Sequence, residues 1–252
     1  MRFIIRLSLA IASVSFALLF VVLTVSVIKG QWFGKSEVTG KNHVAVVDLS
    51  GVIINSNPFT TELNERLDEK TTKAVVIRIN SPGGLVGPSQ EIFEAIKKAD
   101  EKVPVVISMG SLAASGGYYA ALGGRKIFAN PGTLTASIGV IMEFMNLEKL
   151  YSWAKIDRIT LKAGKFKDVG NPNRPMRADE KALLDTMLAD IHQQFRAAVK
   201  ERRKLTDPEL DVTADGRIMT GSQANKAKLV DHLGGFEDAV KEARAIAKLP
   251  DD

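Results

Sequence analysis

Two glycine-rich turns, each directly after an apolar run, constrain the fold of this chain most strongly. Residues 74–79 (Ala-Val-Val-Ile-Arg-Ile) precede the turn 80–84 (Asn-Ser-Pro-Gly-Gly), and residues 103–107 precede the segment 109–119 (Met-Gly-Ser-Leu-Ala-Ala-Ser-Gly-Gly-Tyr-Tyr). Short apolar runs bounded by glycine and proline are typical of buried strands. The carboxyl ends of parallel strands share one edge of a sheet, where α/β folds bind ligands. We therefore expect both turns to lie together at such an edge.

Strand-like and helix-like patterns alternate along the rest of the chain. This alternation predicts an α/β fold built from right-handed βαβ units. The expected strands are residues 44–49, 74–80, 105–109, 126–129, 138–142 and 158–161, and the expected helices are residues 60–70, 88–98, 115–122, 147–155, 178–203, 222–228 and 236–248.

The N-terminus carries an uncharged, apolar run at residues 7–28, preceded by Arg2 and Arg6. This run is long enough to cross a bilayer, and no Ala-x-Ala cleavage pattern follows it. We interpret residues 1–30 as one uncleaved transmembrane helix, residues 31–42 as a linker and residues 43–250 as the folded domain. A cleaved signal peptide is the alternative. The short basic N-terminus is expected to stay in the cytoplasm, which puts the domain on the other side of the membrane.

Composition excludes several classes of site. The 252 residues are 45% apolar and 25% charged, as in ordinary folded proteins, so extensive disorder is not expected. The chain has no cysteine, which excludes disulfides, thiol catalysis and thiolate metal sites. Its net charge of +5 is scattered along the sequence, and no basic groove for nucleic acid is expected.

Ser115 stands where an expected strand meets an expected helix, with Gly116 directly after it. A serine at such a junction can present its hydroxyl to a substrate, beside the free N–H groups of the first helical turn. Small residues in a tight turn that only allows close packing of helix and sheet would give the same pattern.

Five segments, in order, resemble the signal peptide peptidase A family between about residues 44 and 240. They are residues 80–84, 113–119, 132–140 and 162–168, and residues 215–217 with 233–235. The resemblance implies a Clp protease-like fold and a serine endopeptidase that needs no cofactor or metal. It also implies a single-pass protein of the bacterial inner membrane, with its catalytic domain on the periplasmic or extracytoplasmic side.

A serine nucleophile needs a base. None of the three histidines, His43, His192 and His232, belongs to a glycine-rich turn, so none is favoured. The resemblance assigns the base to Lys167, although a basic surface loop would also explain this lysine-rich segment. A free lysine has a pKa of about 10.4. Lowering this pKa to about 7–8, so that the amine is neutral, requires about 3–4 kcal/mol of destabilisation of the ammonium form.

Further site residues surround this pair. The resemblance implies that Ser137 orients the lysine, although a strand-start residue without a special role is the alternative. The N–H of Gly116 is expected in the oxyanion hole because it adjoins the nucleophile, and the family pattern gives Gly84 as the second donor. Family members commonly have glycine where this chain has Ala136. We expect alanine to be tolerated unless a positive φ is required, which would put the position of Ser137 in doubt.

The chain has one copy of each motif, as in short members of the family. The resemblance implies that such chains form ring-shaped homo-oligomers, in which adjacent protomers contribute to each groove. We expect the protein to cleave apolar peptides such as signal peptide remnants. A crotonase-like acyl-CoA enzyme has the same βαβ architecture and remains an alternative, as does a non-catalytic membrane scaffold.

Overall fold

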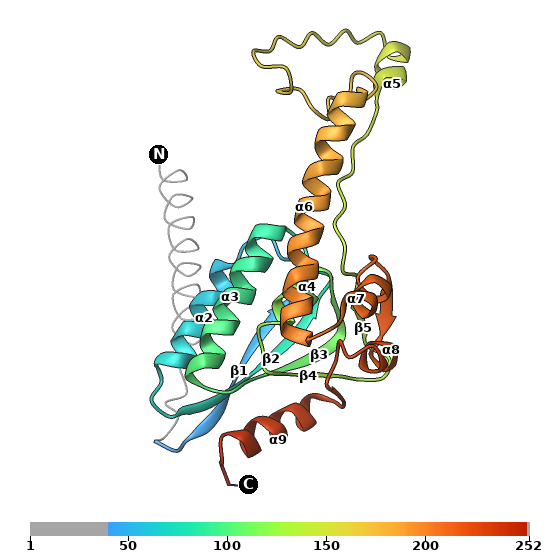
Figure 1. The fold of residues 1–252 in the computed structure, drawn as a ribbon. Helices are drawn as coiled ribbons and strands as arrows, with labels where there is room; N and C mark the ends of the chain where they lie inside the picture. The colour runs from blue at the N-terminus through green and yellow to red at the C-terminus, as the bar shows by residue number, and fades with distance from the viewer. Residues whose placement is uncertain (1–39, 251–252) are drawn as a thin grey trace, which may run out of the picture. The chain divides into compact units, whose positions relative to one another are not determined.

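A computed structural model describes residues 40–250, and those from Asn42 onward form one compact unit (Figure 1). The predicted anchor at residues 1–30, and most of the predicted linker at residues 31–42, lie outside the described residues. None of the helices within residues 40–250 combines the length and the apolar character that crossing a bilayer requires.

The centre of the unit is a sheet of seven strands, whose main path has the order β1-β2-β3-β4-β7. Neighbours on this path run parallel, β5 adds to β3 in parallel, and β6 pairs with β5 in antiparallel. The α/β class with a parallel sheet is therefore confirmed. The strands are β1 (His43–Ser50), β2 (Thr72–Ser81), β3 (Val105–Ala114), β4 (Lys126–Ala129), β5 (Leu134–Ala136), β6 (Ile218–Thr220) and β7 (His232–Leu233).

Burial along the strands follows their positions in the sheet. β2 is buried almost continuously because both of its faces are covered, whereas β1, at the edge, alternates between buried and exposed residues. β3 bends part-way along: Ile79 pairs with Met109, but Ser81 pairs with Ala113. On its side away from β2, β3 pairs with β4 before this bend and with β5 after it, through Leu112 to Ala114.

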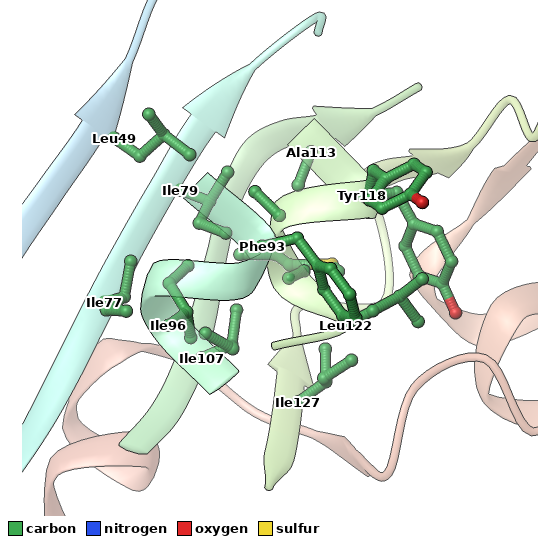
Figure 2. Close-up of a cluster of buried hydrophobic side chains, with 14 of the residues drawn as sticks. Leu49, Ile77, Ile79, Phe93, Ile96, Ile107, Ala113, Tyr118, Leu122 and Ile127 are labelled. Carbon is green, nitrogen blue, oxygen red and sulfur yellow. The ribbon is translucent and has the colours of Figure 1, made fainter. Parts of the chain in front are cut away.

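Helices cover both faces of the sheet. Isoleucines of β2 and β3 pack with α3 and α4 on one face (Figure 2), and α9 closes the other face over Val76, Val106 and Phe128. The helices are α2 (Asn57–Asp68), α3 (Val86–Lys102), α4 (Gly116–Ala121), α5 (Glu148–Trp153), α6 (Ala178–Arg203), α7 (Asp207–Thr213), α8 (Gly221–Lys226) and α9 (Phe236–Ile246).

The C-terminal half of α6 is fastened to this body. Tyr119 of α4 packs against Phe93 of α3 and Phe195 of α6, with ring centroids 5.3 and 4.6 Å apart. The guanidinium of Arg202 donates to the carbonyls of Leu122, Gly123 and Gly124 just after α4, at 2.8–3.2 Å. These contacts fix the direction of α6 relative to the sheet.

Residues 139–177, here called the arm, run along the N-terminal half of α6 and beyond it, with α5 near the far end (Figure 1). The strands expected at residues 138–142 and 158–161 are wrong, since no part of either joins the sheet. Of their apolar side chains, Ile138 is buried in the core, whereas Ile141, Ile159 and Leu161 are 82–91% exposed. Neither segment pairs with another strand among residues 40–250.

Candidate active site

Ser115 forms a sharp elbow between β3 and α4. Its backbone has φ 53° and ψ −123°, a conformation that residues other than glycine rarely adopt. Two backbone hydrogen bonds hold it there: the Ser115 N–H donates to the Ala136 carbonyl at 2.8 Å, and the Ser115 carbonyl accepts from Tyr119 N–H at 2.9 Å. The strained elbow therefore belongs to the folded body, between the sheet and the first turn of α4.

Close contacts require both glycines of the turn at residues 80–84. Gly83 has φ +92°, and a Cβ there would lie 2.5 Å from the Gly116 nitrogen and 2.9 Å from the Ser115 Cβ. A Cβ on Gly84 would lie 2.1 Å from the Ile53 carbonyl oxygen. All three distances are below van der Waals contact, so neither position can carry a side chain, and Gly83 packs directly against Ser115 and Gly116. The predicted neighbourhood of the two turns is observed.

The N–H groups of Gly84 and Gly116 lie side by side. A Cβ on Gly116 would be 3.2 Å from the Gly84 nitrogen, and neither N–H has a hydrogen-bond acceptor among residues 40–250. The flanking groups are engaged, since Ile53 N–H donates to the Gly83 carbonyl and Leu85 N–H donates to the Ile53 carbonyl. Two free, adjacent donors beside a serine hydroxyl have the layout of an oxyanion hole.

A cleft of about 600 Å³ opens beside the elbow. A smaller pocket adjoins it, and its lining combines both glycines and Ser115 with apolar side chains of α4 and α6. The cleft is lined by Pro82, Gly84, Val86, Ser115, Ser137, Gly139, Val140, Ile141, Leu188, Ala189, His192, Asp215 and Gly216. The structure thus brings Ser115, Ser137 and Gly84 to one cavity.

Ser137 adjoins the elbow because β5 is paired with the end of β3. Ala114 faces Ala136 in this pair, so the next residues are Ser115 and Ser137. Ala136 has φ 63° and Ser137 has φ 52°. The positive φ at position 136 is the condition under which alanine was expected to be unfavourable, yet Ser137 still reaches the cleft. Its N–H donates to the Arg217 carbonyl at 2.9 Å, which holds this strained turn in place.

His192 lines the same cleft, which sequence reasoning did not foresee. Its Nε2 lies 3.1 Å from the Ile138 carbonyl and 2.9 Å from the Ala214 carbonyl. Two acceptors at one nitrogen require that Nε2 carry the hydrogen. Its place in the sequence, next to Ile191 on the apolar side of α6, was the available signal. His43 and His232 lie outside the cleft, beside Glu69 and Phe128 respectively.

Lys167 lies on the arm and does not line the cleft. The other lysines of its segment are paired, Lys162 with Asp168 and Lys165 with Asp179. Lys167 makes no ion pair or side-chain hydrogen bond with any residue that the structure describes. The chain therefore assembles Ser115, Ser137, Gly84 and Gly116 at one site and leaves Lys167, exposed, elsewhere. Within residues 40–250, no three His, Asp or Glu side chains are grouped to hold a metal ion.

Sequence comparisons identify relatives of this arrangement. Residues 97–250 match the family described as "Peptidase family S49", and residues 57–135 match the family described as "Clp protease". A Synechocystis protein provisionally named a protease is 38% identical over 213 residues, which cover 84% of this chain and 77% of that protein. A provisionally named signal peptide peptidase SppA of Enterococcus faecium is 32% identical, covering 90% of this chain and 73% of the relative.

The chloroplastic serine protease SPPA of Arabidopsis thaliana is 33% identical over 225 residues, covering 84% of this chain but only 33% of the plant protein. The chain therefore matches most of its shorter relatives and about a third of this longer one. The resemblance to signal peptide peptidase A is confirmed. The chain belongs to peptidase family S49, a family of serine proteases.

Proposed function

We propose that the protein is a membrane-anchored serine endopeptidase that uses Ser115 and Lys167 as a dyad to cleave apolar peptides. One observation carries the proposal: a strained serine elbow stands beside two adjacent N–H groups that have no acceptor in the described chain. Family membership supports the peptidase over a crotonase-like acyl-CoA enzyme. A non-catalytic scaffold would have no need of the strain at Ser115 or of the free donors.

The reaction follows from these groups. Ser115 Oγ attacks the peptide carbonyl while the neutral amine of Lys167 takes the hydroxyl proton. The N–H groups of Gly84 and Gly116 bind the oxyanion, and Ser137 orients the amine. The lysine ammonium then returns the proton to the leaving amine. Water, deprotonated by the same amine, hydrolyses the acyl-enzyme and restores Ser115.

The base is supplied by a neighbouring copy in a ring-shaped homo-oligomer. Lys167 is exposed on the arm, away from the cleft of its own chain, so the site of a single chain lacks its base. The arm also exposes large apolar side chains, which is costly unless another surface covers them. Trp153, Ile159 and Leu161 are 82–91% exposed. Burial of these side chains against the next protomer would bring Lys167 to that protomer's Ser115.

The lining of the cleft supports an apolar substrate. Val86, Val140 and Ile141 line the cleft, and Ile191 and Phe195 line the small pocket beside Ser115. Signal peptide remnants fit such a surface, and the name of the Enterococcus relative, signal peptide peptidase, agrees with that substrate. The apolar run at residues 7–28 would hold the enzyme in a bacterial inner membrane, with the catalytic domain on the periplasmic or extracytoplasmic side.

Labelling with a fluorophosphonate tests the proposal, because this reagent forms a covalent bond with an activated serine. We expect the wild-type full-length chain to be labelled and Ser115→Ala to be unlabelled, with unchanged thermal unfolding. Ser111→Ala is the matched control, since Ser111 is an exposed serine of the same segment. Equal labelling of Ser115→Ala and wild type, or no labelling of either, would reject the nucleophile.

The anchor requires its own test. Membranes from cells that express the full-length chain should retain it after a carbonate wash. Release of the chain, with a new N-terminus between residues 26 and 34, would instead indicate a cleaved signal peptide.

A further inference from the structure

A cluster of charged side chains joins the arm to the first turn of α6. Its members are Lys162, Asp168, Arg174 and Arg177 of the arm and Glu180 of α6; we call it the Arg174 cluster. It lies within the segment that carries Lys167, and the proposed reaction gives it no role.

Asp168 is the carboxylate next to Lys167 in sequence, and both of its oxygens are occupied. Oδ1 accepts from Lys162 Nζ, and Oδ2 accepts from Arg174 at 2.9 Å. Arg174 also donates to the Asp168 backbone carbonyl at 3.2 Å. The Asp168 side chain is only 10% exposed, and the hydrogen bonds from Lys162 and Arg174 hold its pKa well below the usual range. The carboxylate therefore stays ionised and turned toward Arg174.

Glu180 fixes the other side of the guanidinium. Its two oxygens accept from Arg174 at 2.6 and 2.8 Å, and one of them also accepts from the Arg177 N–H at 2.9 Å. The Glu180 side chain has no exposed surface. Planar, two-point binding of a carboxylate by arginine sets an orientation as well as an attraction. Arg174 thereby connects Asp168 to a group that is itself fixed to the start of α6.

The remaining charges around the Lys167 segment are also paired. Lys165 pairs with Asp179 at 2.8 Å, and Arg177 contacts Asp179 and Glu180 at 3.1 and 2.9 Å. The three carboxylates of this region, Asp168, Asp179 and Glu180, are thus bound by other cations. In the described part of the chain, Lys167 is left without an acidic partner.

We propose that Arg174 is a positioning residue for the Ser115–Lys167 dyad: by binding Asp168 and Glu180 together, it keeps the adjacent carboxylate from pairing with Lys167. This inference rests on the proposed function. A lysine acts as a base only when its amine is neutral, and an ion pair with a carboxylate stabilises the ammonium form. Without Arg174, one oxygen of Asp168 is free to turn toward Lys167, so a higher pH is needed to obtain the same fraction of neutral amine.

The test is the pH dependence of kcat/KM for an apolar peptide, measured on the full-length protein. We expect Arg174→Ala to move the rising limb of the profile to higher pH by at least about half a unit, which lowers activity about threefold on that limb. Adding Asp168→Asn in the same chain should move the limb back, because the competing charge is removed. Arg174→Lys, which keeps the charge but loses the two-point geometry, should fall between Arg174→Ala and wild type.

Arg196→Ala is the matched control, since Arg196, farther along α6, pairs with Asp211 of α7, does not line the cleft and is not part of the Arg174 cluster. Its profile should coincide with that of the wild type. An Arg174→Ala profile that coincides with the wild type would overturn the inference, as would a loss at every pH that Asp168→Asn does not reverse. Full activity of Ser115→Ala or Lys167→Ala would instead overturn the proposed function, so the two failures are distinguishable.

Discussion

The two halves of the proposed dyad are held in opposite ways. Ser115 belongs to the buried body, where backbone hydrogen bonds and closely approaching glycines fix it between β3, β5 and α4. Lys167 belongs to the arm, which is exposed and is attached to the first turn of α6 by ion pairs. The body completes its own contacts within the chain, whereas the arm presents apolar side chains that only another surface can cover. Under the proposed function, a single chain therefore fixes Ser115 in place, whereas Lys167 needs a further surface to be placed at the site.

Mixing two inactive variants tests that contrast most strongly. Ser115→Ala and Lys167→Ala should each lose at least about 10³-fold in kcat, because each removes an essential half of the dyad. If the base comes from a neighbouring copy, dissociating and reassembling an equal mixture should restore activity at about a quarter of the sites. Peptide cleavage before and after mixing measures this. A mixture that stays as inactive as its components would place both groups of the dyad in one chain.

The second prediction compares a glycine of the body with one of the arm. Gly83→Ala should lower kcat by about 10²–10³, since the added Cβ would lie 2.5 Å from the Gly116 nitrogen and displace that donor. Gly164 of the arm also has a positive φ, +98°, but its nearest neighbour lies 4.0 Å from a Cβ there. Gly164→Ala should therefore cost backbone strain with little direct effect on the oxyanion hole.

Gly87→Ala controls for the substitution itself, because nothing lies within 4 Å of a Cβ at this position of α3. Its kcat should match the wild type. Equal kcat for Gly83→Ala and Gly87→Ala would mean that the close approach at the elbow has no part in turnover.

Sequence reasoning succeeded where local chemistry determines structure. The long helix was predicted at residues 178–203 and is observed as Ala178–Arg203, because its amphipathic pattern is long and Glu180 accepts the Arg177 N–H at its start. The glycine turns were located correctly because each follows a strongly apolar strand. The two-residue and three-residue strands β5, β6 and β7 were not predicted, since such short segments show no periodicity.

The arm was mispredicted for a different reason. Residues 138–142 and 158–161 were interpreted as strands from their apolar runs, but only Ile138 among them is buried and neither segment joins the sheet. The position of His192 in the cleft depends on how α6 packs over α4, which no local pattern encodes. In the proposed oligomer, Lys167 acts at the site of a second copy of the chain, and neither the sequence pattern nor the packing of one chain could then determine its position relative to Ser115.

The third prediction compares stability in the two regions. Ile107→Ala should lower the free energy of unfolding by about 2–5 kcal/mol, because Ile107 is fully buried in the core (Figure 2). Leu161→Ala should change it by less than about 0.5 kcal/mol in the dissociated chain, since Leu161 is 91% exposed. Urea unfolding measures both, and sedimentation should show weaker assembly for Leu161→Ala. Normal assembly of that variant would argue against burial of this part of the arm in the oligomer.

The fourth prediction is that acid loosens the attachment of the arm to the first turn of α6 before it loosens the body. Hydrogen bonds from Arg174 lower the pKa of Glu180 to about 2, whereas an unfolded glutamate titrates near about 4.3. The stabilisation is therefore complete above about pH 4.3 and is lost as pH falls toward 2. Hydrogen exchange, corrected for intrinsic rates, should lose protection at residues 164–181 before residues 105–121. Simultaneous loss in both regions would show that the Arg174 cluster does not hold the arm independently.

The smallest effect is expected at Ala136, where the body stores strain. A positive φ of 63° disfavours alanine by about 1–2 kcal/mol relative to glycine. Ala136→Gly relieves this strain but gives up a buried methyl group and adds freedom to the unfolded chain, which together cost about as much. The free energy of unfolding should therefore change by less than about 1 kcal/mol. Ala113→Gly is the control, because Ala113 is equally buried but has no positive φ, so it should be destabilising. If both variants lose the same stability, the turn before Ser137 is not strained, and the pairing of β5 with β3 alone positions that serine.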